Sequence, residues 1–90
     1  MTTYDIQISE RARKDLSGID KQTSSRIISK LKEYRSTSNP MRHAKALTGD
    51  AKGLFRFRIG DYRAIFEKTK DGRIIILVIL RIKHRKDIYA

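Results

Sequence analysis

Leu54-Phe-Arg-Phe-Arg-Ile-Gly-Asp-Tyr-Arg-Ala-Ile-Phe66 is the stretch of the sequence that decides the fold. Between Phe55 and Ile59 apolar residues alternate with arginines, and this period of two with aromatic side chains is typical of a half-buried β-strand. Gly60-Asp61 then supplies a two-residue loop, in which glycine provides the positive φ of a type II′ turn. The stretch therefore predicts a β-hairpin with one apolar face and one arginine face.

The two-residue loop also determines which residues of the hairpin lie opposite one another. It pairs Ile59 with Tyr62, Arg58 with Arg63, Phe57 with Ala64 and Phe55 with Phe66. Arg58 then lies directly across from Arg63, and like charges in such a pair destabilise a sheet. An external polyanion is the simplest group that would offset this repulsion.

The composition indicates one basic globular domain spanning residues 1–90. A chain of 90 residues that is 39% hydrophobic has enough material for one modest core. Its 21 Lys and Arg against 10 Asp and Glu give a net charge of +11, which points to nucleic acid or to an acidic protein partner. The excess is concentrated in residues 42–90, the half that contains the hairpin.

Several classes of site and location are not expected from this sequence. The absence of cysteine excludes disulfides and thiolate metal sites and fits a reducing compartment. The first residues lack the features of a signal peptide, and the longest apolar run, Ile74–Leu80, is too short to span a bilayer. The two histidines have no carboxylates at ligand spacing, and no glycine-rich phosphate loop is present. We therefore expect a cytoplasmic protein with no metal, no cofactor and no membrane partner.

Periodicity in the rest of the chain predicts the order strand, helix, helix, strand, strand, strand. Residues 4–8 alternate as a short strand, and two helices with apolar stripes follow the N-cap residues Ser9 and Asp20. The segment 36–40 is a break, and residues 41–53 are interpreted as a connecting loop with at most one helical turn.

The continuous apolar run after the hairpin predicts a central strand. Because Ile74–Leu80 has no alternation, we expect this strand to be covered on both faces. Residues 84–90 are too few for another packed helix. The expected fold is α+β, an antiparallel-rich four-stranded sheet with two N-terminal helices packed on one face.

The residues that could carry chemistry are cationic or phenolic. They are Arg56, Arg58 and Arg63 of the hairpin and Lys83, His84, Arg85 and Tyr89 of the tail. Metal-free RNA cleavage needs a base for the 2′-hydroxyl, an acid for the leaving oxygen and positive charge at the phosphorane. Arginine binds two phosphate oxygens at once, but its pKa above about 12 makes it a poor base. His84 and Tyr89 are the nearby groups of a type that exchanges protons.

Each of these residues also has a purely structural interpretation. The strand arginines could form the solvated face of an edge strand, although Arg63 across from Arg58 makes that arrangement unfavourable. His84 could be an exposed surface histidine, and Tyr89 an aromatic cap over the end of the sheet. The pair Arg85-Lys86 could be a basic tail.

The same residues resemble the RelE/ParE toxin superfamily over essentially the whole chain. The resemblance is carried by Gly53–Phe66 with its Gly-Asp-Tyr-Arg turn and by the tail Ile82-Lys-His-Arg-Lys-Asp-Ile-Tyr89. Lys45-Ala-Leu-Thr-Gly49 is similar to the lysine-leucine-glycine approach to the hairpin. The RelE-type branch implies an mRNA interferase toxin, a ribosome-dependent endoribonuclease that cuts mRNA in the decoding site and inhibits translation.

This resemblance implies roles for individual residues. Arg56 and Arg58 match basic positions on the strand before the turn, Arg63 and Arg85 would hold and neutralise the scissile phosphate, and Tyr89 would stack on or orient the nucleotide. RelE-type members can carry a lysine where this chain has Arg56 and Arg58, so His84 is the expected substitute as proton acceptor. Further contacts to nucleic acid are expected from Lys45, Lys52, Arg81, Lys83 and Lys86.

The implied partners are mRNA on the ribosome, ribosomal RNA and a cognate antitoxin, for which an acidic stretch would suit the charge of the chain. An alternative within the superfamily is a ParE-like inhibitor of DNA gyrase, which has no catalytic site and no need of the arginines and Tyr89 together. A third is a plain RNA-binding module, which lacks support because the phenylalanines are expected to face the core rather than to stack on bases.

Overall fold

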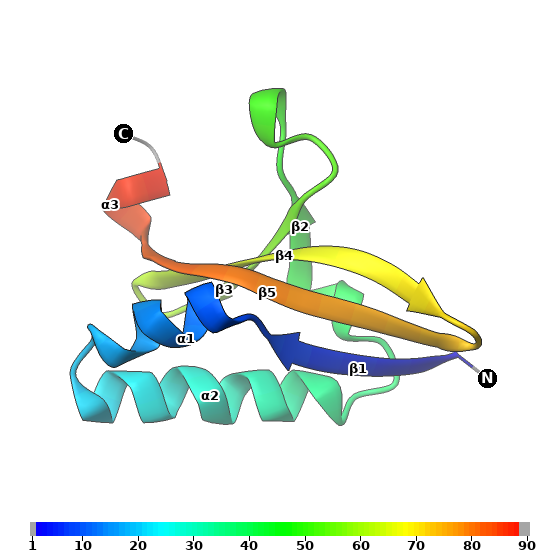
Figure 1. Ribbon diagram of the computed structural model, residues 1–90, viewed down its shortest axis with the longest axis horizontal. Helices are drawn as coiled ribbons and strands as arrows, with labels where there is room; N and C mark the ends of the chain where they lie inside the picture. The colour runs from blue at the N-terminus through cyan, green and yellow to red at the C-terminus, as the bar shows by residue number, and fades with distance from the viewer. Residues whose placement is uncertain (1, 89–90) are drawn as a thin grey trace.

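The core of the fold is a five-stranded mixed sheet (Figure 1). The computed structural model describes residues 2–88. The strands are β1 (Thr3–Ile8), β2 (Ala44–Ala46), β3 (Phe55–Ile59), β4 (Tyr62–Asp71) and β5 (Ile74–His84), in the order β1-β5-β4-β3-β2. β1 runs parallel to β5, and every other pair is antiparallel.

Helices cover one face of this sheet. α1 (Glu10–Ser17) and α2 (Lys21–Arg35) follow β1 and lie together below the strands in Figure 1. The predicted caps are confirmed, since the Ala12 amide donates to Ser9 Oγ at 3.1 Å and the Thr23 amide donates to an Asp20 carboxylate oxygen at 3.0 Å. Short 3₁₀ turns, η1 (Pro40–His43) and η2 (Gly49–Ala51), flank β2, and the one-turn α3 (Arg85–Ile88) follows β5.

The prediction of an α+β fold with two N-terminal helices on one face is confirmed, but the count of four strands is wrong. The additional strand is β2, inside the segment interpreted as a loop, and the tail adds the short α3. β2 has three residues, of which Lys45 and Ala46 are exposed, so no side-chain pattern identified it. Its backbone pairs along the outer edge of β3 and leaves less of that edge unpaired.

The hairpin prediction is confirmed pair by pair. β3 and β4 pair Phe55 with Phe66, Arg56 with Ile65, Phe57 with Ala64, Arg58 with Arg63 and Ile59 with Tyr62. Gly60 has φ of 58°, and no described residue other than glycine has a positive φ, as a type II′ turn requires. Local turn chemistry and alternation therefore determine the register.

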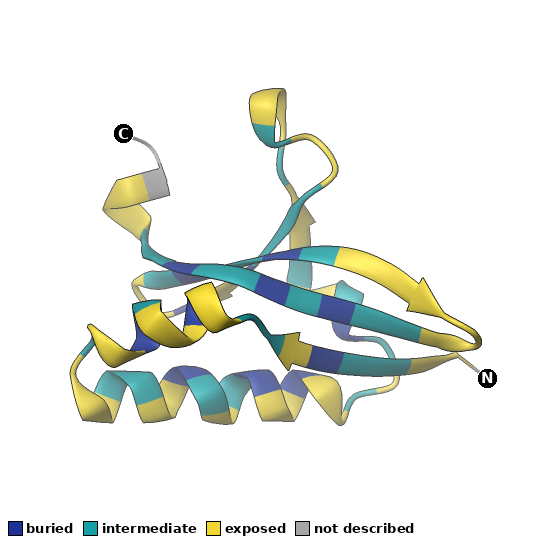
Figure 2. Ribbon diagram, in the orientation of Figure 1, coloured by how far each residue is buried: buried dark blue, intermediate teal, exposed yellow. Residues whose placement is uncertain are grey.

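The apolar core lies between the helices and one face of the sheet. Phe57, Phe66, Leu77 and Ile79 are fully buried against the apolar stripes of α1 and α2. β5 was expected to be covered on both faces, and this is wrong. Its residues alternate between buried and half-buried along the strand (Figure 2), because helices lie on only one side.

One further property of the helices bears on location. Within residues 2–88, no helix is both long enough and apolar enough to cross a membrane.

Candidate functional site

The face of the sheet opposite the helices carries a row of three cationic side chains. Arg58 on β3 lies directly across from Arg63 on β4, and Arg63 lies directly across from Lys83 on β5. Paired residues on neighbouring strands share a face and are about 5 Å apart. We call Arg58, Arg63 and Lys83 the cationic row. These three residues, separated by up to 25 positions in the sequence, thus lie side by side on the face opposite the helices, which we call the open face; Arg58 is exposed there, Lys83 half-buried and Arg63 buried.

A second row lies beside the cationic row on the same face. Lys45 of β2 pairs with Arg56, Arg56 pairs with Ile65, and Ile65 pairs with Arg81. Lys45 is exposed and Arg56 is half-buried. The open face therefore concentrates positive charge over β2, β3 and the neighbouring parts of β4 and β5. Such a surface suits a polyanion.

Arg63 is the buried member of the cationic row. Its residue is only 6% exposed, and its Nη1 donates hydrogen bonds to the carbonyls of Gly60 at 3.0 Å and Tyr62 at 2.9 Å. These carbonyls of the hairpin turn compensate part of the charge that faces Arg58. The sequence predicted an external polyanion as the simplest group to offset the Arg58–Arg63 repulsion, and in the structure the turn carbonyls offset part of it. The same bonds hold the guanidinium in a defined place.

The tail is attached to the hairpin turn. The Arg85 amide donates to the Asp61 carbonyl at 2.8 Å, and Arg85 Nε lies 3.7 Å from Asp61 Oδ1. These contacts bring Arg85 to the end of the hairpin that carries Arg63. Lys86 is exposed in α3. Tyr89 lies outside the described residues, so its predicted role stays a prediction.

His84 is placed away from the cationic row. It pairs with Tyr62, its ring meets the Tyr62 ring edge-on with centroids 5.2 Å apart, and its Nδ1 accepts the Lys86 amide at 3.2 Å. Because strand residues alternate, His84 shares the helix side with buried Ile82, whereas Lys83 points to the open face. It lines a hollow together with Asp15, Ile19 and Asp87, and Arg81 and Lys83 also border this hollow.

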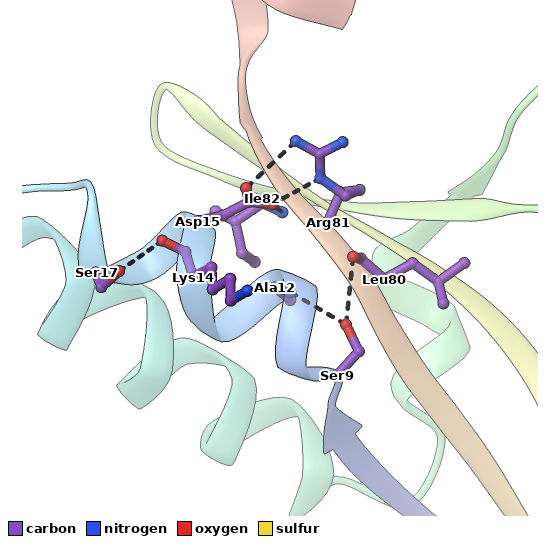
Figure 3. A network of polar contacts seen from close by, with 8 residues as sticks. All are labelled: Ser9, Ala12, Lys14, Asp15, Ser17, Leu80, Arg81 and Ile82. Atoms are coloured by element: carbon purple, nitrogen blue, oxygen red, sulfur yellow. Dashed lines mark hydrogen bonds and ion pairs between the residues drawn. The ribbon is translucent and has the colours of Figure 1, made fainter.

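Arg81 forms an ion pair with Asp15 of α1, so its guanidinium is not left available to nucleic acid (Figure 3). Its Nε donates to Asp15 Oδ2 at 2.9 Å and its Nη2 to Oδ1 at 3.3 Å, while the Ile82 amide also donates to Oδ2 at 2.9 Å. Burial alone would raise the pKa of Asp15, but the hydrogen bonds from Arg81 and Ile82 and the charge of Arg81 together hold it below its ordinary value. The predicted role of Arg81 thus competes with an ion pair.

The Asp15 contacts lie beside a bulge in β5. The pairing with β4 joins Ile65 to Arg81 and Phe66 to Ile79, so the register skips Leu80. Ser9 Oγ donates to the carbonyl of Leu80, the skipped residue itself, at 3.3 Å, and Ser9 lies on the same side of β5 as Asp15. Contacts from Ser9 and from Asp15 of α1 thus hold the bulge, which sets which residues of β5 reach the open face.

Sequence reasoning missed Asp15 because its partners lie 66 and 67 positions away. Nothing in its local sequence, a single acid between Lys14 and Leu16, distinguishes it from a solvated helix residue. The predicted nucleic-acid contact Lys52 is exposed just after η2, in the loop that projects away from the helices (Figure 1).

No set of residues suited to a metal is found in the described part of the chain. Among residues 2–88, no three or more histidine, aspartate or glutamate side chains gather closely enough to hold an ion.

Comparison with known proteins points to one family. The profile described as ParE toxin of type II toxin-antitoxin system, parDE, matches residues 6–89. No curated protein sequence matches the chain.

Solved structures of toxin–antitoxin complexes share the fold. In the RelBE2 toxin–antitoxin complex from Mycobacterium tuberculosis, a chain is 25% identical, with a TM-score of 0.76 and 94% of each chain covered. A chain of the RelB–RelE antitoxin–toxin complex from Methanococcus jannaschii is 26% identical, with a TM-score of 0.62, covering 92% of this chain and 94% of that chain. The RelE–RelB complex from Pyrococcus horikoshii contains a chain that is 25% identical, with a TM-score of 0.61 and coverage of 93% and 97%. Since the family profile spans nearly the whole sequence and the fold agrees, this chain belongs to the ParE toxin family of type II toxin–antitoxin systems, within the RelE/ParE toxin superfamily.

Proposed function

We propose that this toxin is a ribosome-dependent endoribonuclease that cleaves mRNA in the decoding site, without a metal, by attack of the RNA's own 2′-hydroxyl. The observation that carries the proposal is the cationic row, Arg58, Arg63 and Lys83, on the open face of the sheet. The similar toxin–antitoxin complexes from Methanococcus jannaschii and Pyrococcus horikoshii contain RelE, which agrees with this assignment.

The cationic row supplies the charge that the reaction requires. When the 2′-oxygen attacks phosphorus, negative charge accumulates on the phosphorane oxygens, and fixed donors stabilise it. Arg63 is held in place by turn carbonyls, so it can act without first becoming ordered. A preorganised donor of this kind contributes about 3–4 kcal/mol, or roughly 10²–10³ in rate. Exposed Arg58 would bind the phosphate from the adjacent strand, and Arg85 from the end of the hairpin.

The choice of proton acceptor depends on which titratable side chain lies beside the cationic row. His84, the substitute suggested by the resemblance, lies on the helix side and uses Nδ1 to accept the Lys86 amide. Lys83 lies in the cationic row, half-buried and directly across from Arg63. Lysine is a residue type that serves as a general base in enzymes, whereas arginine, whose guanidinium stays protonated, is not. We therefore propose that Lys83 accepts the proton of the 2′-hydroxyl. We retain Tyr89 as the residue that orients the nucleotide.

We also expect an antitoxin partner for this chain, because the similar structures are complexes of a toxin with its antitoxin. Ribosomal RNA would be contacted by exposed basic residues around the open face, Lys45, Lys52 and Lys86. Because its substrate is translating mRNA, the toxin would act in the cytoplasm.

The test separates mRNA cleavage from inhibition of DNA gyrase, the alternative function that the resemblance to the superfamily implies. The purified toxin is incubated with programmed ribosomes and with naked mRNA, and the 5′ ends of the products are mapped. We expect cuts on ribosomes only, and their loss in Arg63→Ala. A parallel supercoiling assay with gyrase supplies the contrast: intact mRNA together with blocked supercoiling would contradict the proposal.

Two variants serve as controls for this assay. Arg63→Lys keeps a positive charge but loses the planar fork, so it tests whether loss of cleavage reflects only loss of folding. Arg26→Ala removes an exposed arginine from the outer surface of α2, far from the cationic row in the fold. It should leave the cleavage rate unchanged.

A further inference from the structure

The bulge in β5 determines the side of the sheet on which Lys83 lies. Ile79 and Ile82 are both buried in the core, although they are three positions apart and regular alternation brings only even spacings to one face. The pairing with β4 skips Leu80, and this extra residue brings Ile82 back to the side of Ile79. If Leu80 were paired in its turn, Arg63 would lie across from Ile82. Lys83 would then point to the helix side, so it belongs to the cationic row because one residue is skipped.

Helix α1 lies beside this part of β5 in place of a strand. The pairing of β5 with β1 ends at Ile79. Just beyond that point the Ser9 hydroxyl donates to the Leu80 carbonyl at 3.3 Å. Two residues further on, Asp15 Oδ2 accepts the Ile82 amide at 2.9 Å (Figure 3). An amide at the edge of a strand needs an acceptor, and here a side chain of α1 provides it.

The Asp15 carboxylate holds two consecutive residues of β5 at once. Besides the Ile82 amide, it binds the Arg81 guanidinium, whose Nε and Nη2 donate to its two oxygens at 2.9 and 3.3 Å. The side chain of Asp15 is 16% exposed and that of Arg81 is 34% exposed, so the contact is partly shielded from water. A bidentate bond between a guanidinium and a carboxylate fixes direction as well as distance. The contact therefore holds β5 at the two residues that directly precede Lys83.

We propose that Asp15 is a positioning residue: by holding the bulge, it keeps Lys83 on the open face and across from Arg63. Asp15 itself does not contact the RNA, because its carboxylate is already bound to Arg81 and to the Ile82 amide. That its loss slows cleavage rests on the proposed function, in which Lys83 accepts the proton; that its loss loosens the end of β5 does not. An ion pair that served stability alone would leave Lys83 in place when it is removed.

Amide hydrogen exchange of the intact toxin tests the structural half of this inference without RNA. Because amides alternate in direction along a strand and the Ile82 amide points to Asp15, the Lys83 amide points to β4. In Asp15→Ala we expect the Lys83 amide to exchange about tenfold faster, while the amides that join β3 to β4 change less. Asp20→Ala is the matched control, since it removes the cap of α2 and destabilises the domain without touching β5. In that control the Lys83 amide should not accelerate more than the amides between β3 and β4.

Cleavage of mRNA on ribosomes tests the catalytic half. Asp15→Ala should lower kcat by about 10²-fold, since a displaced catalytic group costs this much, and should leave KM nearly unchanged because Arg58 and Arg63 stay in place. Asp15→Asn should restore most of kcat, because its amide oxygen can still accept the Ile82 amide. In a Lys83→Ala background, Asp15→Ala should slow cleavage by less than about a further twofold, because the residue that it positions is gone.

Two results would overturn the inference. One is equal acceleration, in Asp15→Ala, of the Lys83 amide and the amides between β3 and β4, which would show that Asp15 only stabilises the domain. The other is a double variant in which the losses from Asp15→Ala and Lys83→Ala multiply, because Asp15 would then act independently of Lys83. The proposed function fails separately. If Lys83→Ala cleaves at the wild-type rate while the Lys83 amide still accelerates in Asp15→Ala, the assigned proton acceptor is wrong and the positioning of Lys83 by Asp15 stands.

Discussion

The two faces of the sheet are formed by the same strands but differ in burial and in charge. On the helix face, Phe57, Phe66 and Leu77 are fully buried, and their positions are determined by packing against α1 and α2. On the open face, Arg58 and Lys83 occupy the alternate positions and remain accessible to solvent. Stability is concentrated on the first face and charge on the second. Because neighbouring residues of one strand serve different faces, substitutions one position apart should separate folding from function.

Phe57→Ala is expected to have the largest effect and to test the helix face. Phe57 is 0% exposed and stacks on Phe66 with ring centroids 4.4 Å apart. Replacing a buried phenylalanine by alanine leaves a cavity and costs about 3–5 kcal/mol, a large part of the stability of a small domain. Chemical denaturation followed by circular dichroism measures the loss. A loss below about 1 kcal/mol would mean that the helix layer packs differently.

Arg58→Ala is the matched change on the open face, one residue away. Arg58 is exposed and makes no contact that the core needs, so the free energy of unfolding should stay within about 0.5 kcal/mol of the wild type. Removing a donor to the phosphate should nevertheless lower the cleavage rate on ribosomes about 10²-fold. If Arg58→Ala instead destabilised the protein while preserving cleavage, the idea that the helix face provides stability and the open face provides catalysis would be wrong.

The contrast between the faces also explains how far the sequence could predict the fold. The hairpin register was predictable because a two-residue loop and strict alternation are local features, and they fix each pair from Phe55–Phe66 to Ile59–Tyr62. The helix caps at Ser9 and Asp20 were predictable for the same reason. β2 was not, because its three residues pair through their backbone and carry no distinctive side-chain pattern.

The exposure of one face of β5 and the bulge in this strand could not be predicted from the sequence. An apolar run indicates a buried strand, but it does not reveal how many layers the chain has available to cover it, and here the helices cover one side. The skipped Leu80 depends on contacts from Ser9 and Asp15, which are distant in sequence. The side on which His84 lies was accessible from alternation, since it is two residues beyond the buried Ile82.

Asp15→Ala removes the contact that joins α1 on the helix face to Arg81, and its effect on stability should be intermediate. The carboxylate accepts hydrogen bonds from Arg81 and from the Ile82 amide, and bonds to charged groups contribute about 1.5–3 kcal/mol. We expect a loss of stability of this order by denaturation at neutral pH. Freed from Asp15, Arg81 can turn toward the open face, so binding of RNA should not weaken.

The pH dependence of this contact has a defined sign. Because the pKa of Asp15 is lowered in the folded protein, its contribution is complete above the unfolded value of about 3.9 and is lost as the pH falls through the folded value. The stability difference between wild type and Asp15→Asn should therefore shrink on acidification below about pH 4. Asp20, whose pKa is lowered by hydrogen bonds from Thr23, contributes to acid sensitivity in both proteins and cancels in the comparison.

His84→Ala is expected to have the smallest effect and gives the sharpest test of which face supplies the proton acceptor. His84 shares the helix side with Ile82 and packs edge-on against Tyr62, whereas Lys83 lies in the cationic row. We therefore expect His84→Ala to change the cleavage rate by less than about threefold, the scale of about 0.5 kcal/mol for a surface substitution.

Lys83→Ala is the matched partner of that variant, one position away and on the other face. It should lower cleavage by about 10²–10⁴, because general-base catalysis typically contributes this much, and it should remove the ascending limb of the pH–rate profile, which a general base produces as it loses its proton. If instead His84→Ala abolished the ascending limb and Lys83→Ala only weakened binding of RNA, the imidazole would be the base. The tail would then have to rearrange on the ribosome so that His84 reaches the open face, and the separation between the faces would hold only for the free toxin.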